Sequence, residues 1–272
     1  VRKSDHSSIY ATTDLATIIQ REEDFHPDKI WYVVDNRQGL HFTQVFRCAK
    51  KAGLVPPQTE FEFLGFGTMN GADGKPYKTR EGGIMKLEDM IATVTAGAQE
   101  KLEASSFVDE ADYQDMALKV GVAVIKFGDL INQRAKDYVF DLSKFFSFEG
   151  KTGPYLLYTI TRINSILKKA GVPADQPLLL TGVYTDSERE LLLKILMGGD
   201  VFQRTLAEKA PNYLCEDAYQ LANSFSKFYH DNRIIDEPDE AKKQSWLALI
   251  SLVRQVLCNH LDLLGIETVE HM

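Results

Sequence analysis

Three cysteines are too few and too far apart for a disulfide framework or a thiolate metal site. Cys48, Cys215 and Cys258 are odd in number and match no Cys-x-x-Cys spacing. They are expected to be buried thiols in a reducing compartment. The six histidines are scattered along the chain. The sequence therefore predicts no protein-bound metal.

Long hydrophobic runs are also missing. No run approaches the roughly 18 residues that a membrane-spanning helix needs. The opening VRKSD leads into polar residues rather than the apolar core of a signal peptide. The net charge of the 272 residues is −8, which argues against broad, non-specific nucleic-acid binding but not against a local basic surface. We expect a cytoplasmic protein with no membrane partner.

The first hundred residues alternate between apolar runs and helical patterns. The run KIWYVV is rich in β-branched and aromatic residues and is typical of a buried strand. Thr13 is expected to cap the first helix. The predicted order is helix 14–21, strand 29–34, helix 38–52, strand 61–66, a loop and helix 86–103. This order indicates a parallel α/β sheet with too few strands to be complete.

From residue 109 onward the apolar residues recur at helical spacing. The expected helices are 109–132, 154–169, 188–206, 217–229 and about 246–264, with a packed aromatic connector at 134–149 and a surface loop at 235–243. The predicted fold class is therefore α/β followed by all-α. We expect domain boundaries at 1–108, 109–149 and 150–272, with the middle segment a connector.

A glycine-rich stretch, residues 65–83, holds six glycines together with Lys78, Thr79 and Arg80. Glycine lets backbone N–H groups approach an anion, and lysine and arginine supply charge that matches phosphate. The stretch therefore suggests a phosphate-handling loop. A polar hairpin with Asp73-Gly74 as its turn explains the same residues and is the commoner case.

Two short polar stretches flank the first predicted strand. Tyr10 and Asp14 are four residues apart, and a carboxylate at such a place can take a guanidinium in a bidentate pair. Gln38 and His41 lie in DNRQGLH, which follows the strand and opens a helix, where open α/β sheets bind ligands. Taken alone, both stretches are as well explained by a turn and a helix cap.

The predicted helix at 154–169 carries Tyr155, Tyr158 and Arg162 on one face, at i, i+3 and i+7. Two aromatic rings and a guanidinium can stack on unpaired RNA bases, each worth roughly 1–3 kcal/mol. In an unknown helix, tyrosines at this spacing more often belong to a core face.

Five stretches, in the right order, resemble bacterial arginyl-tRNA synthetases over essentially the whole chain. YATTDLA is similar to the family's Y-x-T-x-D-[LI]-A, and DNRQGLH to its D-x-R-Q-x-x-H. GADGKPYKTREGG resembles the loop that replaces the KMSKS signature of other class I synthetases. GPYLLYTITR resembles the entry to the anticodon-binding domain, and LLGIETVEHM is nearly the family's C-terminus.

The resemblance assigns roles around the amino acid and ATP. It implies that Asp14 binds the guanidinium of the substrate arginine, that Tyr10 packs on the amino acid and that Gln38 contacts it. His41 would lie towards the adenosine of ATP. Arg37 is expected to be structural.

The KTR residues complete the ATP site in the family. Lys78 would contact the phosphates as pyrophosphate leaves, with Arg80 second and Thr79 beside them. Glu81 departs from the small or basic residue that the pattern has there, which puts the loop's charge in doubt.

For the tRNA, the resemblance implies that Tyr155, Tyr158, Arg162 and Met272 meet the anticodon loop. His271 stands where the family usually has arginine, so that contact loses a permanent charge. The expected helical bundle at 150–272 would then be an anticodon-binding domain.

The resemblance implies an arginine–tRNA ligase that uses ATP with Mg²⁺, L-arginine and an arginine-accepting tRNA, in a parent protein expected to be a cytoplasmic monomer. The class I H-x-G-H motif does not occur in the sequence. We therefore expect a fragment of a longer chain that is inactive alone. The alternative is a non-catalytic tRNA-binding module that retains a vestigial half-site.

Overall fold

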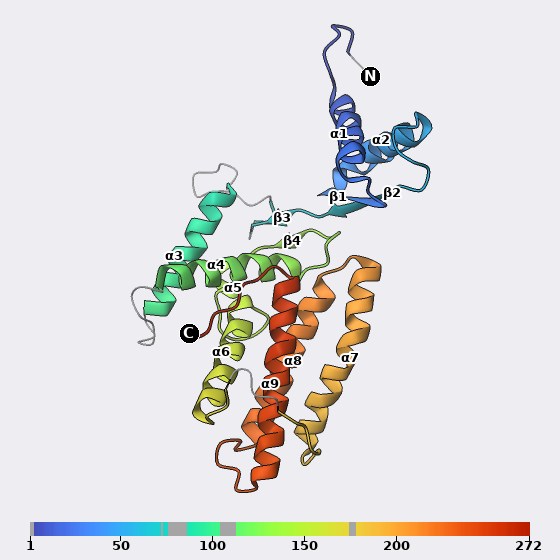
Figure 1. Ribbon diagram of the computed structural model, residues 1–272. Helices are drawn as coiled ribbons and strands as arrows, with labels where there is room; N and C mark the ends of the chain where they lie inside the picture. The colour runs from blue at the N-terminus through green and yellow to red at the C-terminus, as the bar shows by residue number, and fades with distance from the viewer. Residues whose placement is uncertain (1–2, 72, 76–85, 104–112, 174–177) are drawn as a thin grey trace. The chain divides into compact units, whose positions relative to one another are not determined.

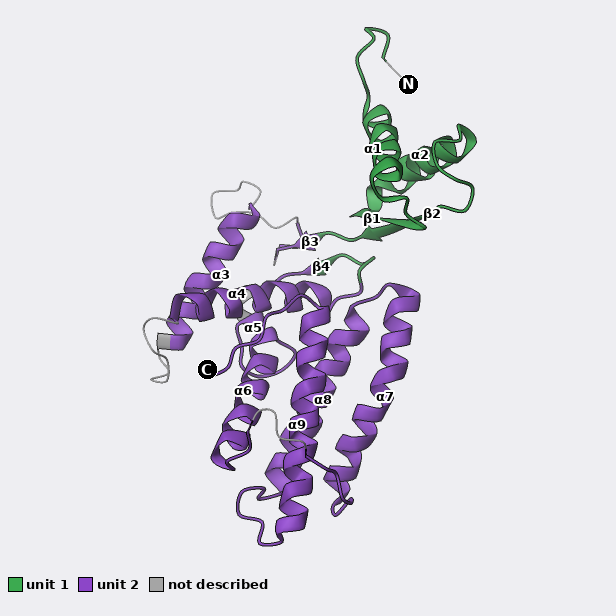
Figure 2. Ribbon diagram, in the orientation of Figure 1, with its two compact units in different colours: residues 1–68, 134–138 green, residues 69–133, 139–272 purple. Residues whose placement is uncertain are grey.

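The computed structural model describes residues 3–71, 73–75, 86–103, 113–173 and 178–272 (Figure 1). The chain divides into two compact units. Unit 1 comprises residues 1–68 with 134–138, and unit 2 comprises residues 69–133 with 139–272 (Figure 2). In the described part of the chain, no helix is both long and apolar enough to cross a membrane.

Unit 1 is a two-stranded parallel sheet with helices on one face. Its elements are α1 (Tyr10–Phe25), β1 (Lys29–Asp35), the 3₁₀ turn η1 (Asn36–Gln38), α2 (Gly39–Lys51) and β2 (Glu60–Phe66). In the register of the sheet, Tyr32 lies beside Phe63 and Asp35 beside Phe66. The expected strand–helix–strand order and the incomplete parallel sheet are confirmed.

The two faces of this sheet differ. Ile30 and Tyr32 of β1 are buried in the core of unit 1, together with Ile18 of α1 and Phe42 and Val45 of α2. The alternate β1 residues, Trp31 and Val33, are exposed. Successive strand residues point to opposite faces, so the second face exposes these two β1 residues, although Leu64, the β2 partner of Val33 on that face, is buried.

Helix α1 begins earlier than the sequence predicts. Its N-cap is Ile9, which makes no side-chain capping bond. Thr13 is not the cap, because its hydroxyl donates to the carbonyl of Tyr10 from inside the first turn. The expected N-cap at Thr13 is therefore wrong, and Tyr10 and Asp14 both belong to α1.

Unit 2 is built mainly from helices. Its helices are α3 (Leu87–Glu103), α4 (Tyr113–Leu130), α5 (Leu142–Phe145), α6 (Gly153–Lys169), α7 (Asp186–Glu208), α8 (Asn212–Asp231) and α9 (Glu240–Leu263). A short pairing of β3 (Met69–Asn70) with β4 (Tyr138–Val139) lies where the chain passes between the units.

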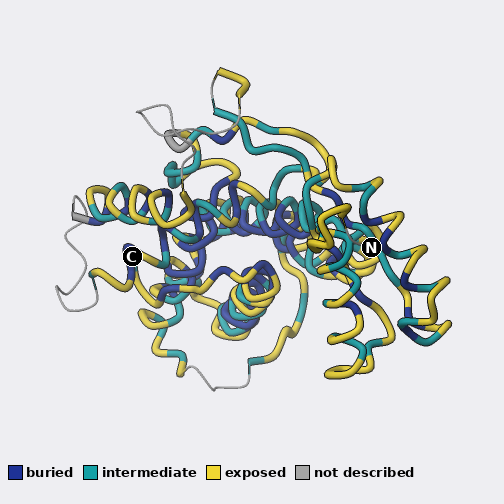
Figure 3. Tube along the Cα trace, turned by 90° about the horizontal axis from the view of Figure 1, so that it is seen from above, coloured by how far each residue is buried: buried dark blue, intermediate teal, exposed yellow. Residues whose placement is uncertain are grey.

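One hydrophobic core runs through unit 2, formed where α4, α6, α8 and α9 face one another (Figures 1 and 3). Fully buried members include Phe127 of α4, Ile160 of α6, Phe225 of α8 and Leu257 of α9. The fold class predicted from the sequence, α/β followed by all-α, is confirmed.

Gly153 at the start of α6 permits a close helix contact. A Cβ at this position would lie 2.4 Å from the carbonyl oxygen of Ala123 in α4, well inside van der Waals contact. Thr152 caps the helix by accepting from the N–H of Tyr155, and Pro154 occupies the first turn. The expected helix opening at Pro154 is confirmed.

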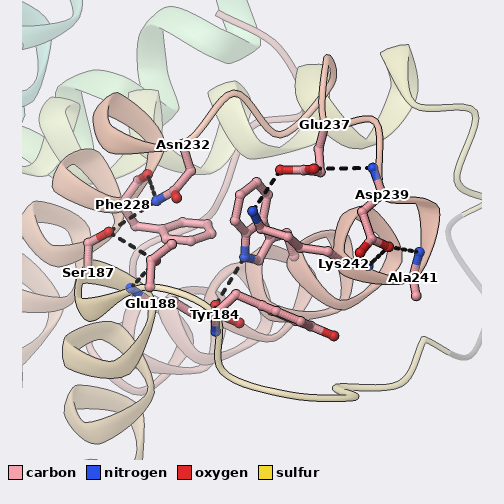
Figure 4. Close-up of polar contacts among 11 residues, drawn as sticks. Tyr184, Ser187, Glu188, Phe228, Asn232, Glu237, Asp239, Ala241 and Lys242 are labelled. Atoms are coloured by element: carbon pink, nitrogen blue, oxygen red, sulfur yellow. Dashed lines mark hydrogen bonds and ion pairs between the residues drawn. The ribbon is translucent and has the colours of Figure 1, made fainter.

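Buried polar contacts fix the start of α7 against α9 (Figure 4). Thr185 caps α7 by accepting from the N–H of Glu188. The buried carboxylate of Glu188 accepts from the N–H of Tyr184 at 2.7 Å and from the indole Nε1 of Trp246 at 3.1 Å. This is a variant of the capping box, in which the acidic side chain reaches back past the cap.

Three further expectations are wrong in detail. Cys48 is exposed, whereas Cys215 is buried and Cys258 is half-buried. Cys48 lies on the solvent-facing side of α2, so its side chain is not packed into the core of unit 1. Helix α8 starts five residues before the predicted 217, and α9 starts within the loop expected at 235–243, because Asp239 caps it through the N–H groups of Ala241 and Lys242.

Candidate functional site

The clearest polar contact of unit 1 joins Asp14 to His41. Nε2 of His41 lies 2.6 Å from Oδ2 of Asp14. The Asp14 side chain is 29% exposed and that of His41 is 33% exposed, so the pair is open to solvent on one side. One turn of α1 and the first turn of α2 thus present a carboxylate and an imidazole to each other.

Tyr32 of β1 supplies a further polar group in unit 1. Its hydroxyl is buried and has no hydrogen-bond partner in the described part of the chain. Burial raises the pKa of the phenol, while the charge of Arg21, whose guanidinium lies 5.4 Å from the ring centre, lowers it. Asp14 also acts on this phenol electrostatically and raises its pKa.

Tyr10 and Gln38 are both exposed. The Tyr10 side chain stands at the start of α1 and is 87% exposed. Gln38 ends the short turn η1, at the carboxyl end of β1. The structure therefore brings Asp14 and His41 into contact and leaves Tyr10 and Gln38 in solvent.

Arg37 forms an ion pair with Asp35 in the described fold. Its Nε and Nη2 donate to the two carboxylate oxygens of Asp35, at 2.8 and 2.6 Å. These hydrogen bonds lower the pKa of Asp35 to about 2. Arg37 is thus paired with the last residue of β1, while 83% of its side chain stays exposed.

The glycine-rich stretch is described only in part. Its first half contains a tight turn, in which the N–H of Gly71 donates to the carbonyl of Lys75 at 2.8 Å and Gly74 has a φ of +71°. This agrees with a turn at Asp73-Gly74. Lys78, Thr79, Arg80 and Glu81 lie outside the described residues.

In unit 2, the face of α6 that carries Tyr155 and Arg162 lies along α8. The Tyr155 hydroxyl is 2.9 Å from Oδ1 of Asn223 and 3.2 Å from the Ser226 hydroxyl. The guanidinium of Arg162 lies 4.4 Å from the ring centre of Tyr229. Tyr155 is half-buried, whereas Tyr158 and Arg162 are exposed.

The aromatic surface of unit 2 is larger than the sequence indicates. Tyr219 of α8 packs against Tyr155 with ring centres 5.8 Å apart, and the ammonium of Lys151 lies 5.5 Å above Tyr219. Tyr219 and Tyr229 are ten residues apart on α8, and no local pattern marks them as neighbours of α6. Only the packing of α6 on α8 brings them to this surface.

Metal ligands do not gather in the described residues. No group of three or more histidine, cysteine, aspartate or glutamate side chains there is placed to hold an ion.

Comparison with known families shows to which protein family the chain belongs. Residues 1–142 match the family model for the catalytic domain of class I (R) tRNA synthetases. Residues 156–272 match the DALR anticodon-binding domain. The chain belongs to the class I arginyl-tRNA synthetases. The resemblance that the five sequence stretches indicate is thereby confirmed.

Individual arginyl-tRNA synthetases are similar over the whole chain. It is 50% identical to the arginine–tRNA ligase of Alkaliphilus oremlandii over 273 residues, covering 100% of this chain and 46% of that protein. The arginine–tRNA ligase of Agathobacter rectalis is 42% identical over 285 residues, covering 100% of this chain and 47% of that protein. The chain spans about half the length of these curated relatives.

Solved structures agree. Arginyl-tRNA synthetase from Plasmodium falciparum has a TM-score of 0.81 at 27% identity, covering 100% of this chain and 46% of that one. The Thermus thermophilus enzyme has the same fold, with a TM-score of 0.81 at 23% identity, covering 100% of this chain and 50% of that one.

Sequence reasoning on this arginyl-tRNA synthetase chain missed three features of its candidate sites. They are the pairing of His41 with Asp14, the buried Tyr32 hydroxyl and the stacking of Arg162 on Tyr229. The first could have been suspected, because both residues stand in family motifs. The other two depend on tertiary packing and leave no local signal.

Proposed function

We propose that this chain serves an arginine–tRNA ligase, in which ATP activates arginine and the activated arginine is passed to its tRNA. The amino acid's α-carboxylate attacks the α-phosphate of ATP, and pyrophosphate leaves as the arginyl-adenylate forms. A terminal hydroxyl of the tRNA then attacks the acyl carbon, and AMP leaves. The substrates are ATP with Mg²⁺, L-arginine and the tRNA, in a cytoplasmic parent protein that works as a monomer.

One observation carries the arginine part of the proposal. The Asp14 carboxylate is partly exposed and is held on one oxygen by His41, and it also acts electrostatically on the buried phenol of Tyr32. A carboxylate in this state can accept a planar guanidinium on its open side. In this proposal Gln38 and Tyr10 approach the same amino acid from η1 and the start of α1, and His41 lies towards the adenosine.

The phosphate part of the proposal rests on Lys78, Thr79 and Arg80. Phosphoryl-leaving chemistry needs positive charge and positioning rather than covalent help from the protein. Lys78 and Arg80 supply that charge, and Thr79 a hydroxyl. The boundaries at 1–108, 109–149 and 150–272 stay a prediction.

Arginine binding tests the proposal directly. The affinity of the 272-residue chain for L-arginine and for citrulline, its uncharged isostere, is measured by ligand-observed NMR. Asp14→Asn is expected to weaken arginine binding by tenfold or more and to abolish the preference over citrulline, because the carboxylate partner of the cation is lost.

The matched control is Asp24→Asn, on the exposed end of the same helix. It removes the same charge from α1 and is expected to leave arginine binding unchanged. Equal arginine affinity in Asp14→Asn and Asp24→Asn would contradict the assignment of Asp14.

A second candidate is a tRNA-binding module without catalysis. It is favoured by the core of unit 2, which is continuous and independent of the core of unit 1, and by the Tyr155–Arg162 surface on α6.

The two candidates differ in one assay. A ligase bound to ATP, arginine and tRNA catalyses arginine-dependent pyrophosphate exchange once the H-x-G-H half of the site is supplied, whereas a module binds tRNA without exchange.

A further inference from the structure

Several of the last eight residues of the chain contact the helices of unit 2. After α9, Ile266 and Val269 are buried in the main core. The ammonium of Lys126 in α4 donates to the carbonyl of Gly265. Residues 265–272, called here the C-terminal tail, therefore have fixed contacts up to Val269.

Beyond Val269, one side chain of α6 holds the backbone of the tail. Nδ2 of Asn164 donates to the carbonyl oxygen of Glu270 at 3.1 Å. Nε of Arg254, from α9, donates to Oδ1 of the same amide. A guanidinium can only donate and a carbonyl can only accept, so the two partners fix the orientation of the Asn164 amide.

Met272 ends this tail, and the family resemblance implies that it meets the anticodon loop. Its side chain packs against the core of unit 2 and stays partly exposed. The exposed part of such a methionine side chain offers a polarisable thioether surface to a partner. Its place depends on the path of residues 270–271, because both of these are exposed.

We propose that Asn164, held in orientation by Arg254, is a positioning residue that presets the C-terminal tail for tRNA. The inference rests on the proposed function, in which the chain serves tRNA, and on the family resemblance, which implies the anticodon loop as the partner of Met272. An ordered tail loses less conformational freedom when the RNA binds, and this raises affinity without a new contact. Asn164 itself touches no RNA in this account.

The test uses the whole chain and its truncation after Val269, which removes the partner of Asn164 and Met272 together. Affinity for an arginine-accepting tRNA is measured for the unaltered chain, Asn164→Ala, the truncated chain and the truncated chain with Asn164→Ala. Asn164→Ala is expected to weaken binding about threefold to tenfold, the worth of one hydrogen bond. In the truncated chain the same substitution is expected to have no effect.

Two further variants keep the test sharp. Arg254→Lys retains the positive charge but removes the Nε donor, so it is expected to weaken binding less than Asn164→Ala and only when the tail is present. Gln255→Ala, an exposed neighbour on α9, is the control. Release of Met272 by a carboxypeptidase reports on the tail without RNA, and Asn164→Ala is expected to speed it severalfold.

The outcomes separate the two proposals. If the unaltered chain binds no tRNA, the proposed function falls and the tail role falls with it. If the chain binds tRNA and Asn164→Ala matches Gln255→Ala, the tail role alone is overturned. Faster release of Met272 with unchanged tRNA affinity, or equal losses in the full and truncated chains, also overturns it, because Asn164 would then act through stability alone.

Discussion

The two units of this chain differ in how their functional residues are supported. In unit 1 the helices pack on one face of a two-stranded sheet, and Trp31 on the other face is 46% exposed. In unit 2 a single core joins several helices, and Trp246 is 2% exposed and bonded to the buried Glu188. The chain's two tryptophans thus report two different environments.

The difference extends to the candidate sites. In unit 1 the residues assigned to arginine and ATP that the structure describes stand in η1 and in the first two turns of α1 and α2, and the side chains of Asp14 and His41 are in contact. In unit 2 Tyr155 and Arg162 are also part of the α6–α8 packing. We infer that substitutions in the unit 1 site change the affinity for ligands more than the free energy of unfolding, whereas substitutions at the unit 2 site change both.

The largest expected effect separates the two tryptophans. Trp246→Ala removes a fully buried ring and leaves Glu188 without its indole donor, so the free energy of unfolding of unit 2 should fall by about 3–5 kcal/mol. Trp31→Ala should cost unit 1 about 1 kcal/mol, since the side chain is already half in water. Urea unfolding followed by circular dichroism measures both. Equal losses would contradict the contrast between the units.

The next effect concerns a buried charge cluster of unit 2. Oδ1 of Asp217 lies 2.5 Å from Nζ of Lys194, and Oδ2 lies 2.9 Å from Nε2 of His260. The other ring nitrogen of His260 is 2.7 Å from the carbonyl of Val256. Asp217→Asn should cost about 2–3 kcal/mol, because it leaves His260 buried and Lys194 half-buried without a carboxylate.

The sign of the pH dependence follows from the same cluster. Burial raises the pKa of Asp217, but the hydrogen bonds from His260 and Lys194 outweigh it and leave the pKa below its ordinary value of 3.8. The stabilisation is therefore complete above that value and is lost as the pH falls through the lower, folded-state pKa. Unfolding curves of a Trp31→Phe background, read through Trp246 fluorescence, should show this acid loss, and Asp217→Asn should lack it. A parallel acid profile in both chains would exclude the cluster as its cause.

A smaller effect distinguishes two helical glycines of unit 2. Gly153→Ala should cost about 1–3 kcal/mol, because the new Cβ would lie 2.4 Å from the Ala123 carbonyl and α6 must move off α4. Gly199→Ala, in the middle of α7 with nothing within 4 Å of the added Cβ, should be neutral or stabilising by up to about 1 kcal/mol. Thermal unfolding of the two variants compares them, and similar shifts of Tm would rule out the close contact at Gly153.

Local patterns predict much of the fold. The runs at Lys29 and Phe61 identify β1 and β2, and Pro154 with Gly171 bounds α6 correctly. The first residue of a helix is harder to predict, because more than one nearby residue is of a type that can cap its N-terminus. Thr13 is a good cap by type, yet the helix continues back to Tyr10, and Asp239 starts α9 inside a stretch that reads as a polar loop.

The residues of the candidate sites can be predicted only where they belong to one of the short sequence motifs. Asp14 and His41 both stand in such stretches, and the fold brings them together across 27 residues of sequence. Tyr229 and Asn164 gain their contacts from the packing of helices that are far apart in the chain. Such contacts depend on the crossing of α6 with α8 and α9, which no local spacing encodes.

The most direct test of the account is the affinity of the chain for an arginine-accepting tRNA against the same tRNA with its central anticodon base changed. Measurement at two salt concentrations separates phosphate attraction from base recognition, because only the former falls steeply with salt. We predict a clear loss of affinity on the base change at both concentrations, carried by the Tyr155–Arg162 face of unit 2. Weak, salt-sensitive binding that ignores the base would contradict the account.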